Sequence, residues 1–500
     1  MKVKLSETGH EQIKTRWTQK QKEGWTREHL CTEASQFAEP DTPWKEFFNV
    51  RRYALNCTPE TLDRFLRGEV IQWQGFLAFC QALNIEPSRV AELDNLLEKL
   101  TQNIAPIWVG RESVQSELLN KLKGDCRIMV ITGITGIGKT ALAYKLAEVL
   151  CQDGFPPEVP IDFDGFNQPD NQQSQPTAQN FTSVAIELLH RVDEPVTGTQ
   201  AKNPQQLLNK LVDNLVAHRR LIWLDSVENL LEGKTEDGSN RFKDPLWRHF
   251  FQKIVEAEAF PSRIVITSQD KPADFKTFGQ TNYWHIEAIT GLNAEERIQL
   301  FQRLFEQAEV DLILDGTNRA HLKYIGEIYE GHPLALRLIA GDIINRLNGN
   351  IVRYWEENKD RFRRVKRMID EAEQADINDY YKTNILSNKS EKENLIKKIL
   401  EEEIQGTIDR LESFFETAYL LLIYGSVYPY FELKQAWFFQ LQLYLEYEEE
   451  ALELALLTLF NRYLVEIQQH PGNEIHIKQH NLIRNVAFKN LKTPKNKRDK

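Results

Sequence analysis

The residues best suited to chemistry form a glycine-rich loop between an apolar run and an amphipathic segment. The run, residues 127–132, leads directly into GITGIGKT, residues 133–140, which fits the pattern G-x-x-x-x-G-K-[ST]. Backbone N–H groups of such a loop converge on phosphate oxygens, and a Cβ at the glycines would block that approach. Apolar residues at helical spacing over 141–150 predict a helix, whose N-terminus favours a bound anion. The loop is therefore predicted to bind the phosphates of a nucleotide.

Individual residues of this loop have distinct expected roles. Lys139 should reach the β- and γ-phosphates, and the Thr140 hydroxyl should ligate Mg²⁺. The alternative, a glycine-rich turn without a ligand, is disfavoured because strand, loop and helix follow one another in the required order. The residues expected to contact the nucleotide are Gly133, Gly136, Ile137, Gly138, Lys139, Thr140 and Ala141.

A second apolar run, residues 220–224, ends in an acid, Asp225. Open α/β sheets bind their ligands at the carboxyl ends of the strands, so Asp225 is expected to hold Mg²⁺ together with Thr140. Glu228 lies three residues further on and is the candidate catalytic base that polarises an attacking water. Its alternative role is that of an acid at the start of a helix.

Composition limits the remaining possibilities. A chain of 500 residues is expected to form about three or four domains. The net charge of −11 argues against a general nucleic-acid coat. No apolar run approaches the roughly 20 residues of a membrane helix, and the N-terminus lacks an apolar signal core. The five cysteines form no C-x-x-C pair and read as buried thiols, so we expect a cytoplasmic chain without membrane contact.

The first 104 residues are expected to form a small helical unit. A short helix is predicted between Thr58, a suitable N-cap, and Gly68, a suitable stop. A further helix is predicted over residues 76–83. This helix order resembles the helix-turn-helix of phage-repressor-like DNA-binding domains, and the resemblance implies that Arg64 and Arg67 face DNA. Because acidic and basic residues are nearly balanced here, a helical bundle that binds a protein is the alternative.

Four further segments accompany the loop and Asp225 in a fixed order. They are IWVGRE at 107–112, RIVITSQ at 263–269, GHPLAL at 331–336 and QHNLI at 479–483. The set resembles the NB-ARC type of STAND ATPase, the switch module of plant resistance proteins, apoptotic scaffolds and many bacterial regulators. The resemblance covers residues 105–490.

The resemblance implies roles for four more residues. Val109 and Arg111 would lie beside the adenine and ribose, and Pro333 would pack against the base. His480 would reach the β-phosphate of ADP and hold the module closed.

The chain departs from the family pattern at four positions. Ser226 stands where many relatives carry a second acid, and Gln269 stands where an arginine senses the γ-phosphate. A neutral amide cannot make a charge-assisted bond to phosphate, so hydrolysis is expected to be slow at most. Gln479 and Asn481 replace the Met and Asp that flank the family's histidine.

The expected fold is multidomain. An α/β P-loop NTPase core with a parallel sheet is preceded by a small all-α domain and followed by a helical domain and a winged helix. The expected bounds are 1–104 for the helix-turn-helix-like effector domain, 105–285 for the nucleotide-binding domain, 286–400 for the helical domain, 401–490 for the winged helix and 491–500 for a flexible basic tail.

The function that the resemblance implies is an ADP/ATP-dependent molecular switch. ADP would hold the winged helix on the nucleotide-binding domain, and ATP would release it for self-association into a homo-oligomer and for signalling to a protein effector. Two alternatives stay open. One is an ATP-controlled transcription regulator that binds DNA through the N-terminal domain, and the other is a plain ATPase.

Overall fold

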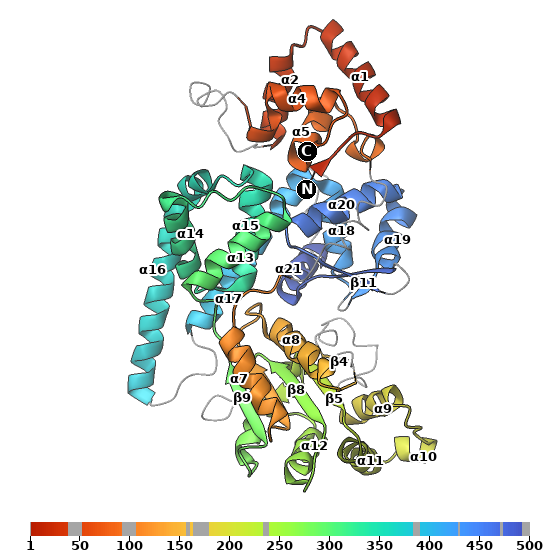
Figure 1. Cartoon of the computed structure of the whole chain (residues 1–500), viewed down its shortest axis with the longest axis vertical. Coiled ribbons are helices and arrows are strands. Elements are labelled where there is room, and N and C mark those ends of the chain that lie inside the picture. The colour runs from red at the N-terminus through yellow and green to blue at the C-terminus, as the bar shows by residue number, and fades with distance from the viewer. Residues whose placement is uncertain are drawn as a thin grey trace.

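Figure 1 shows the computed structural model, in which four units follow one another along the chain. The N-terminal unit (2–92) and the sheet unit (107–288) lie at opposite ends of the molecule, and the helical unit (294–414) and the C-terminal unit (416–492) lie between them. The structure describes residues 2–38, 53–92, 107–156, 161–163, 180–233, 240–383, 391–428, 431–470 and 474–492.

The sheet unit is built on five parallel strands in the order β4-β5-β8-β3-β9. Their residues are largely apolar and β-branched, which suits a sheet covered on both faces. Because the strands are parallel, their carboxyl ends meet at one edge, where Asp162 pairs in register with Asp225 and Thr132 with Ser268. The strands are β3 (Ile128–Thr132), β4 (Ile161–Asp162), β5 (Leu221–Asp225), β8 (Arg263–Ser268) and β9 (Trp284–Ala288).

Side chains alternate along each strand between two separate hydrophobic cores. On β3, Ile128 and Val130 join the core with α9, α11 and α12, whereas Met129 and Ile131 join the core with α7 and α8. This arrangement confirms the predicted parallel α/β core. The helices are α7 (Glu112–Lys123), α8 (Lys139–Gln152), α9 (Phe181–Arg191), α10 (Gly198–Ala201), α11 (Pro204–Ala217) and α12 (Pro245–Glu256), and the short pair β6 (Leu231–Glu232) and β7 (Arg241–Phe242) lies beside them.

The helical and C-terminal units share one continuous hydrophobic core. The expected boundary at residue 400 falls inside α17, so this helix carries the chain across it. The helical unit contains α13 (Ala294–Gln307), α14 (Gly316–Ile328), α15 (Pro333–Leu347), α16 (Ile351–Thr383) and α17 (Glu391–Phe414).

The C-terminal unit combines helices with a three-stranded antiparallel sheet in the order β10-β12-β11. The turn between β11 and β12 and most of the expected basic tail lie outside the described residues. The elements are α18 (Glu416–Gly425), β10 (Glu432–Leu433), α19 (Lys434–Leu445), α20 (Glu449–Asn461), β11 (Glu466–His470), β12 (Glu474–Lys478) and α21 (Asn481–Lys492).

The N-terminal unit contains the predicted helices and three elements that the sequence analysis missed. Thr58 caps α4 by accepting a hydrogen bond from the Thr61 N–H, as its residue type predicts. The all-α description is wrong, because β1 pairs with β2, and α1 was missed because it buries only Gly9, Ile13 and Trp17. The elements are β1 (Lys2–Val3), α1 (Glu7–Lys22), α2 (Arg27–Ala38), α4 (Pro59–Leu66), β2 (Ile71–Gln72) and α5 (Trp73–Ala82).

The connection from β9 to α13, residues 289–293, joins the helical unit to the sheet unit and provides a test of the fold. A Cβ on Gly291 would lie 1.8 Å from the carbonyl oxygen of Glu330, so the two chain segments fit only around a glycine. We expect Gly291→Ala to lower the free energy of unfolding by about 1–3 kcal/mol, the usual cost of overpacking. The control is Gly279→Ala, because no atom lies within 4 Å of a Cβ there. Equal stability of both variants in urea denaturation would contradict this packing.

Candidate functional site

The glycine loop 133–140 connects β3 to α8. Gly136 and Gly138 have φ of +81° and +98°, a left-handed backbone conformation that favours glycine. Both positions also need glycine because other parts of the chain approach closely. A Cβ on Gly136 would lie 2.8 Å from Cε1 of His332, and one on Gly138 would lie 2.8 Å from Nη1 of Arg111. The loop is therefore braced by side chains from outside it.

Lys139, Thr140 and Asp225 meet at the carboxyl edge of the sheet. The Lys139 ammonium is buried and donates to the carbonyls of Gly133 (2.8 Å) and Ile134 (3.2 Å). The Thr140 hydroxyl lies 3.1 Å from each carboxylate oxygen of Asp225. This places the cation, the hydroxyl and the carboxylate together, as the loop pattern and the strand-end acid predict.

The oxygen atoms of Thr140 and Asp225 suit Mg²⁺, which takes one or two protein ligands and completes its octahedron with phosphate and water. A second hydroxyl, from Thr267, also donates to Asp225 and accepts from the Ser226 N–H. These bonds fix the orientation of the carboxylate. Within the described residues no group of three or more His, Cys, Asp or Glu side chains could hold a metal, so a protein-only metal cage is not found there.

Glu228 and Gln269 form a pair that the sequence analysis did not foresee. The Gln269 backbone N–H donates to Oε2 of Glu228 (3.0 Å), and its side-chain amide donates to Oε1 (2.7 Å). Gln269 thus holds the candidate base by both carboxylate oxygens. The pair orients Glu228 and presents no positive charge to a phosphate.

Arg111 donates hydrogen bonds to backbone carbonyls of the glycine loop. Its guanidinium donates to the carbonyls of Ile137 and Thr290, and its backbone N–H donates to Glu296 (2.7 Å). It therefore ties the sheet unit to the first helix of the helical unit. The sequence analysis placed Arg111 beside the adenine and ribose, whereas the structure directs its side chain at protein carbonyls. Val109 is partly buried against the core of the helical unit.

His332 is a second brace, and it lies next to the predicted residue Pro333. Its Nδ1 accepts from the Ala335 N–H at the start of α15, and its Nε2–H donates to the carbonyl of Thr135 in the glycine loop (2.9 Å). Pro333 occupies the first helical position, where the lack of an N–H costs nothing. The sequence analysis missed His332 because a histidine before proline reads only as a turn.

The C-terminal unit reaches the same edge of the sheet through Lys478 and His480. Lys478, the last residue of β12, donates to Asp162 at the end of β4 (2.8 Å), and both side chains are mostly buried. Nδ1 of His480 accepts from the Leu482 N–H (3.2 Å), so the neutral ring carries its proton on Nε2 and can donate there. The sequence analysis named His480 but not Lys478.

Basic side chains from three units gather around the loop. Burial is the largest cause that lowers the pKa of His480 to about 3, and the nearby His332, Lys478 and Lys139 contribute to that value. Burial also lowers the pKa of His332 to about 4, with Lys139 and Arg111 adding to the effect. Both rings are therefore neutral at pH 7, so an anion here would offset the charge of Lys139 and could accept a hydrogen bond from Nε2–H of His480, which suits phosphate.

Arg64 and Arg67 lie in the N-terminal unit, away from the loop. Both are exposed, and both face the same acid, Glu69, at 3.5 Å and 2.6 Å. Arg64 also donates to the Val70 carbonyl. The two cations are therefore opposed by a local carboxylate.

A known family model matches the segment that contains the central residues of this site. Residues 122–262, which include the glycine loop and Asp225, match the family model described as "AAA domain". This segment is an AAA-type P-loop ATPase domain. Domains of this kind bind ATP or ADP, usually with Mg²⁺.

Other similarities are more distant. An uncharacterized WD repeat-containing protein of Nostoc sp. (strain PCC 7120) is 25% identical over 336 residues, which cover 61% of this chain and 25% of that protein. A STAND protein with a tetratricopeptide repeat sensor from Pyrococcus horikoshii is 15% identical, with a TM-score of 0.45, over 78% of this chain and 43% of that one. The chain thus spans about a quarter of the curated relative. Within the described residues no helix is long and apolar enough to cross a membrane.

The two depressed imidazole pKa values predict a pH dependence. Both lie below the ordinary value of 6.5, so the folded chain holds His332 and His480 neutral while the unfolded chain takes up protons. Stability is unaffected by them above about pH 6.5 and falls as pH drops toward 4, by up to about 1.4 kcal/mol per pH unit and imidazole. Chemical denaturation at several pH values measures the slope.

His480→Gln should make this slope shallower by one proton. His249→Gln, which changes an exposed histidine on α12, is the control and should leave the slope as in the wild type. The same slope in His480→Gln and the wild type would show that His480 is solvated in the folded chain.

Proposed function

We propose that the chain is an ADP/ATP-dependent molecular switch of the STAND type, closed when ADP is bound. The observation that carries the proposal is the docking of the C-terminal unit on the glycine loop. Lys478 bonds Asp162 across the two units, and His480, two residues further on, lies among Lys139 and His332. The position of the C-terminal unit therefore depends on what occupies the phosphate site.

The C-terminal unit has the element order of a winged helix, which supports this proposal. Helix α18, strand β10 and helices α19 and α20 precede the β11–β12 hairpin, and the three strands form one antiparallel sheet. Lys478 ends the last strand of the wing and His480 precedes α21, so the wing and the following helix carry both contacts to the nucleotide domain.

In the proposed ADP-bound form, the β-phosphate lies at the N-terminus of α8. Lys139 and the loop N–H groups donate to it, and the Nε2–H of His480 donates from the other side. Thr140 and Asp225 hold Mg²⁺ when it is present. Pro333 and Val109 are the residues proposed to contact the base. The anion offsets the charge of Lys139, accepts a hydrogen bond from the neutral His480 ring and so keeps the C-terminal unit in place.

In the proposed ATP-bound form, Mg²⁺ weakens the contact between the two units. Asp225, which Mg²⁺ would share, also attracts the Lys478 ammonium and pairs in register with Asp162. A divalent cation at Asp225 would therefore repel Lys478 and favour release of the C-terminal unit. Release exposes surface for self-association, and the N-terminal unit recruits a protein effector. A protein partner fits this unit better than DNA does, because Glu69 opposes both Arg64 and Arg67.

The proposed switch is at most a slow ATPase. Glu228 is the residue proposed to orient the attacking water, with Asp225 and Mg²⁺ beside the phosphates. Because Gln269 occupies both oxygens of Glu228 and brings no charge, little transition-state stabilisation comes from this side of the site.

The nucleotide site is tested by Lys139→Ala. Removing the ammonium that faces two phosphates should weaken ATP and ADP binding by at least tenfold, because charge-assisted hydrogen bonds contribute about 1.5–3 kcal/mol each. Lys145→Ala is the matched control on the same helix, where Lys145 pairs with Glu148 at the surface. Titration with a fluorescent nucleotide measures both affinities. If the Lys139→Ala variant binds as tightly as the control, the phosphates lie elsewhere.

The contact between the units is tested by Lys478→Met and Asp162→Asn. Each removes one partner of a mostly buried ion pair, so we expect the closed form to lose about 1–3 kcal/mol, a five- to 150-fold shift toward the open form. In ADP, size-exclusion chromatography should show more oligomer, and ADP should dissociate faster. Lys489→Met, which removes a cation from the exposed pair with Glu401, should behave as the wild type. A double variant no worse than either single variant would confirm that the two side chains act as one contact.

A further inference from the structure

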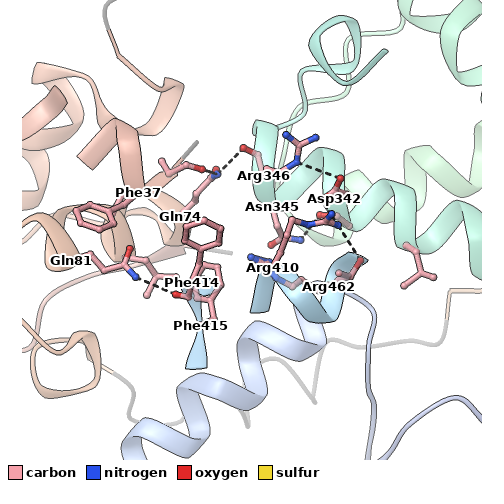
Figure 2. A pocket seen from close by; sticks show the side chains of 16 residues that line it. Phe37, Gln74, Gln81, Asp342, Asn345, Arg346, Arg410, Phe414, Phe415 and Arg462 are labelled. Carbon is pink, nitrogen blue, oxygen red and sulfur yellow. Dashed lines mark hydrogen bonds and ion pairs between the residues drawn. The ribbon is translucent and has the colours of Figure 1, made fainter. Parts of the chain in front are cut away.

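A cavity of about 60 Å³ lies where the N-terminal unit meets the helical and C-terminal units. Figure 2 shows its two sides: Arg346, Arg410, Arg462 and Asp342 lie on one, and Phe37, Gln74 and Gln81 on the other. The charged side comes from α15, α17 and the turn after α20, and the uncharged side comes from α2 and α5. The cavity is remote from the glycine loop, none of whose residues line it.

The charges around this cavity do not balance. Three arginines line it, but Asp342 is the one acid among the residues that do. Asp342 already pairs with Arg346 (3.4 Å) and Arg410 (3.2 Å). Arg346 has a second partner in Glu357. Asp342 is therefore shared between two cations before Arg462 is considered.

Arg462 is the cation left over. Its guanidinium stacks on the ring of Phe415, 4.6 Å from the centroid, and in the described parts of the chain no carboxylate or carbonyl accepts a hydrogen bond from it. Burial lowers its pKa to about 10, with Asp342 opposing that shift and Arg410 adding to it. Even so, the group stays positively charged at neutral pH. A cation that is partly buried without a partner lowers stability unless an anion offsets it.

We propose that this cavity binds a small oxyanion, the phosphate or carboxylate group of a metabolite, through the guanidinium groups of Arg462 and Arg410. Planar guanidinium forks match both oxyanions in geometry and charge. The volume holds a few water-sized groups, so the anionic group fits and a larger ligand would extend outside.

Such a ligand would lie at the joint of the N-terminal unit, the interface between this unit and the helical and C-terminal units. Among the described residues, three hydrogen bonds cross that joint, from Gln72 to the Glu309 carbonyl (3.2 Å), from Gln74 to the Arg346 carbonyl (3.1 Å) and from Gln81 to the Phe414 carbonyl (3.4 Å). The exposed Arg89–Glu448 ion pair (3.8 Å) adds to them. Gln74 and Gln81 line the cavity, so an anion there lies against both sides of the joint. Binding would therefore tie the N-terminal unit to the rest of the chain. This input acts at a site separate from the phosphate loop and goes beyond the proposed switch.

The test uses the full chain saturated with Mg²⁺ and ADP, so that the glycine loop does not capture the probe. Inorganic phosphate and acetate are titrated separately at constant ionic strength with chloride, and binding is followed by calorimetry and thermal unfolding. We expect saturable binding of at least one probe to the wild type and at least tenfold weaker binding to Arg462→Met. Arg462→Lys, which keeps the charge but loses the planar fork, should fall between them. Arg364→Met, which changes an exposed arginine on α16, should match the wild type.

Two further readouts separate this proposal from its rivals. Without either probe, Arg462→Met should be at least as stable as the wild type, because an uncompensated cation is removed. With phosphate or acetate, hydrogen exchange in α5 should slow in the wild type only. The proposal is overturned if neither probe binds, or if Arg462→Met binds as tightly as the wild type. It is also overturned if Lys139→Ala, and not Arg462→Met, abolishes binding. Loss of ADP binding with retained Arg462-dependent anion binding would refute the switch and leave this site standing.

Discussion

The closed arrangement depends on basic side chains brought together from separate parts of the chain around one loop. Lys139 belongs to the loop, His332 to the helical unit, and Lys478 and His480 to the C-terminal unit. The two imidazoles are neutral, whereas the Lys139 and Lys478 ammonium groups are cations that need anions to offset them in a buried setting. Asp162 and Asp225 do this for Lys478. For Lys139 the fitting counter-charge is phosphate, which can also accept a hydrogen bond from the neutral His480 ring, so the docking of the C-terminal unit is sensitive to what the loop holds.

The parallel sheet is what makes this arrangement possible. Its strands end at one edge, so Asp162, Asp225 and the residues after Ser268 face the same space as the loop after β3. The glycines then let two outside groups, the Arg111 guanidinium and the His332 ring, approach within contact of the loop. The loop is thus held by Arg111 of its own unit and by His332 of the helical unit, so a movement of the helical unit would change the phosphate site.

Local patterns predicted the elements that carry the site but not the contacts between units. The loop, the helix that follows it and the Asp225 strand could be predicted from runs of apolar residues and the glycines between them, which are features of the local sequence. The Lys478–Asp162 pair joins residues 316 positions apart, and no local pattern marks either side chain. Arg111 was assigned to the ligand because its family position is known, whereas its direction depends on where the loop carbonyls lie.

The Glu228–Gln269 pair shows the physical effect of having an amide at position 269. An arginine at position 269 would bring a charge that could turn either to a phosphate or to Glu228. Gln269 instead donates from both its backbone N–H and its side-chain amide to Glu228. These two hydrogen bonds hold the Glu228 carboxylate at the end of β8. In the proposed switch, this removes a sensor of the γ-phosphate and leaves Lys478, which Asp225 attracts, as a cation that can respond to Mg²⁺. Discrimination between ADP and ATP would then fall to the C-terminal unit, and nucleotide exchange rather than hydrolysis would set how long each state lasts.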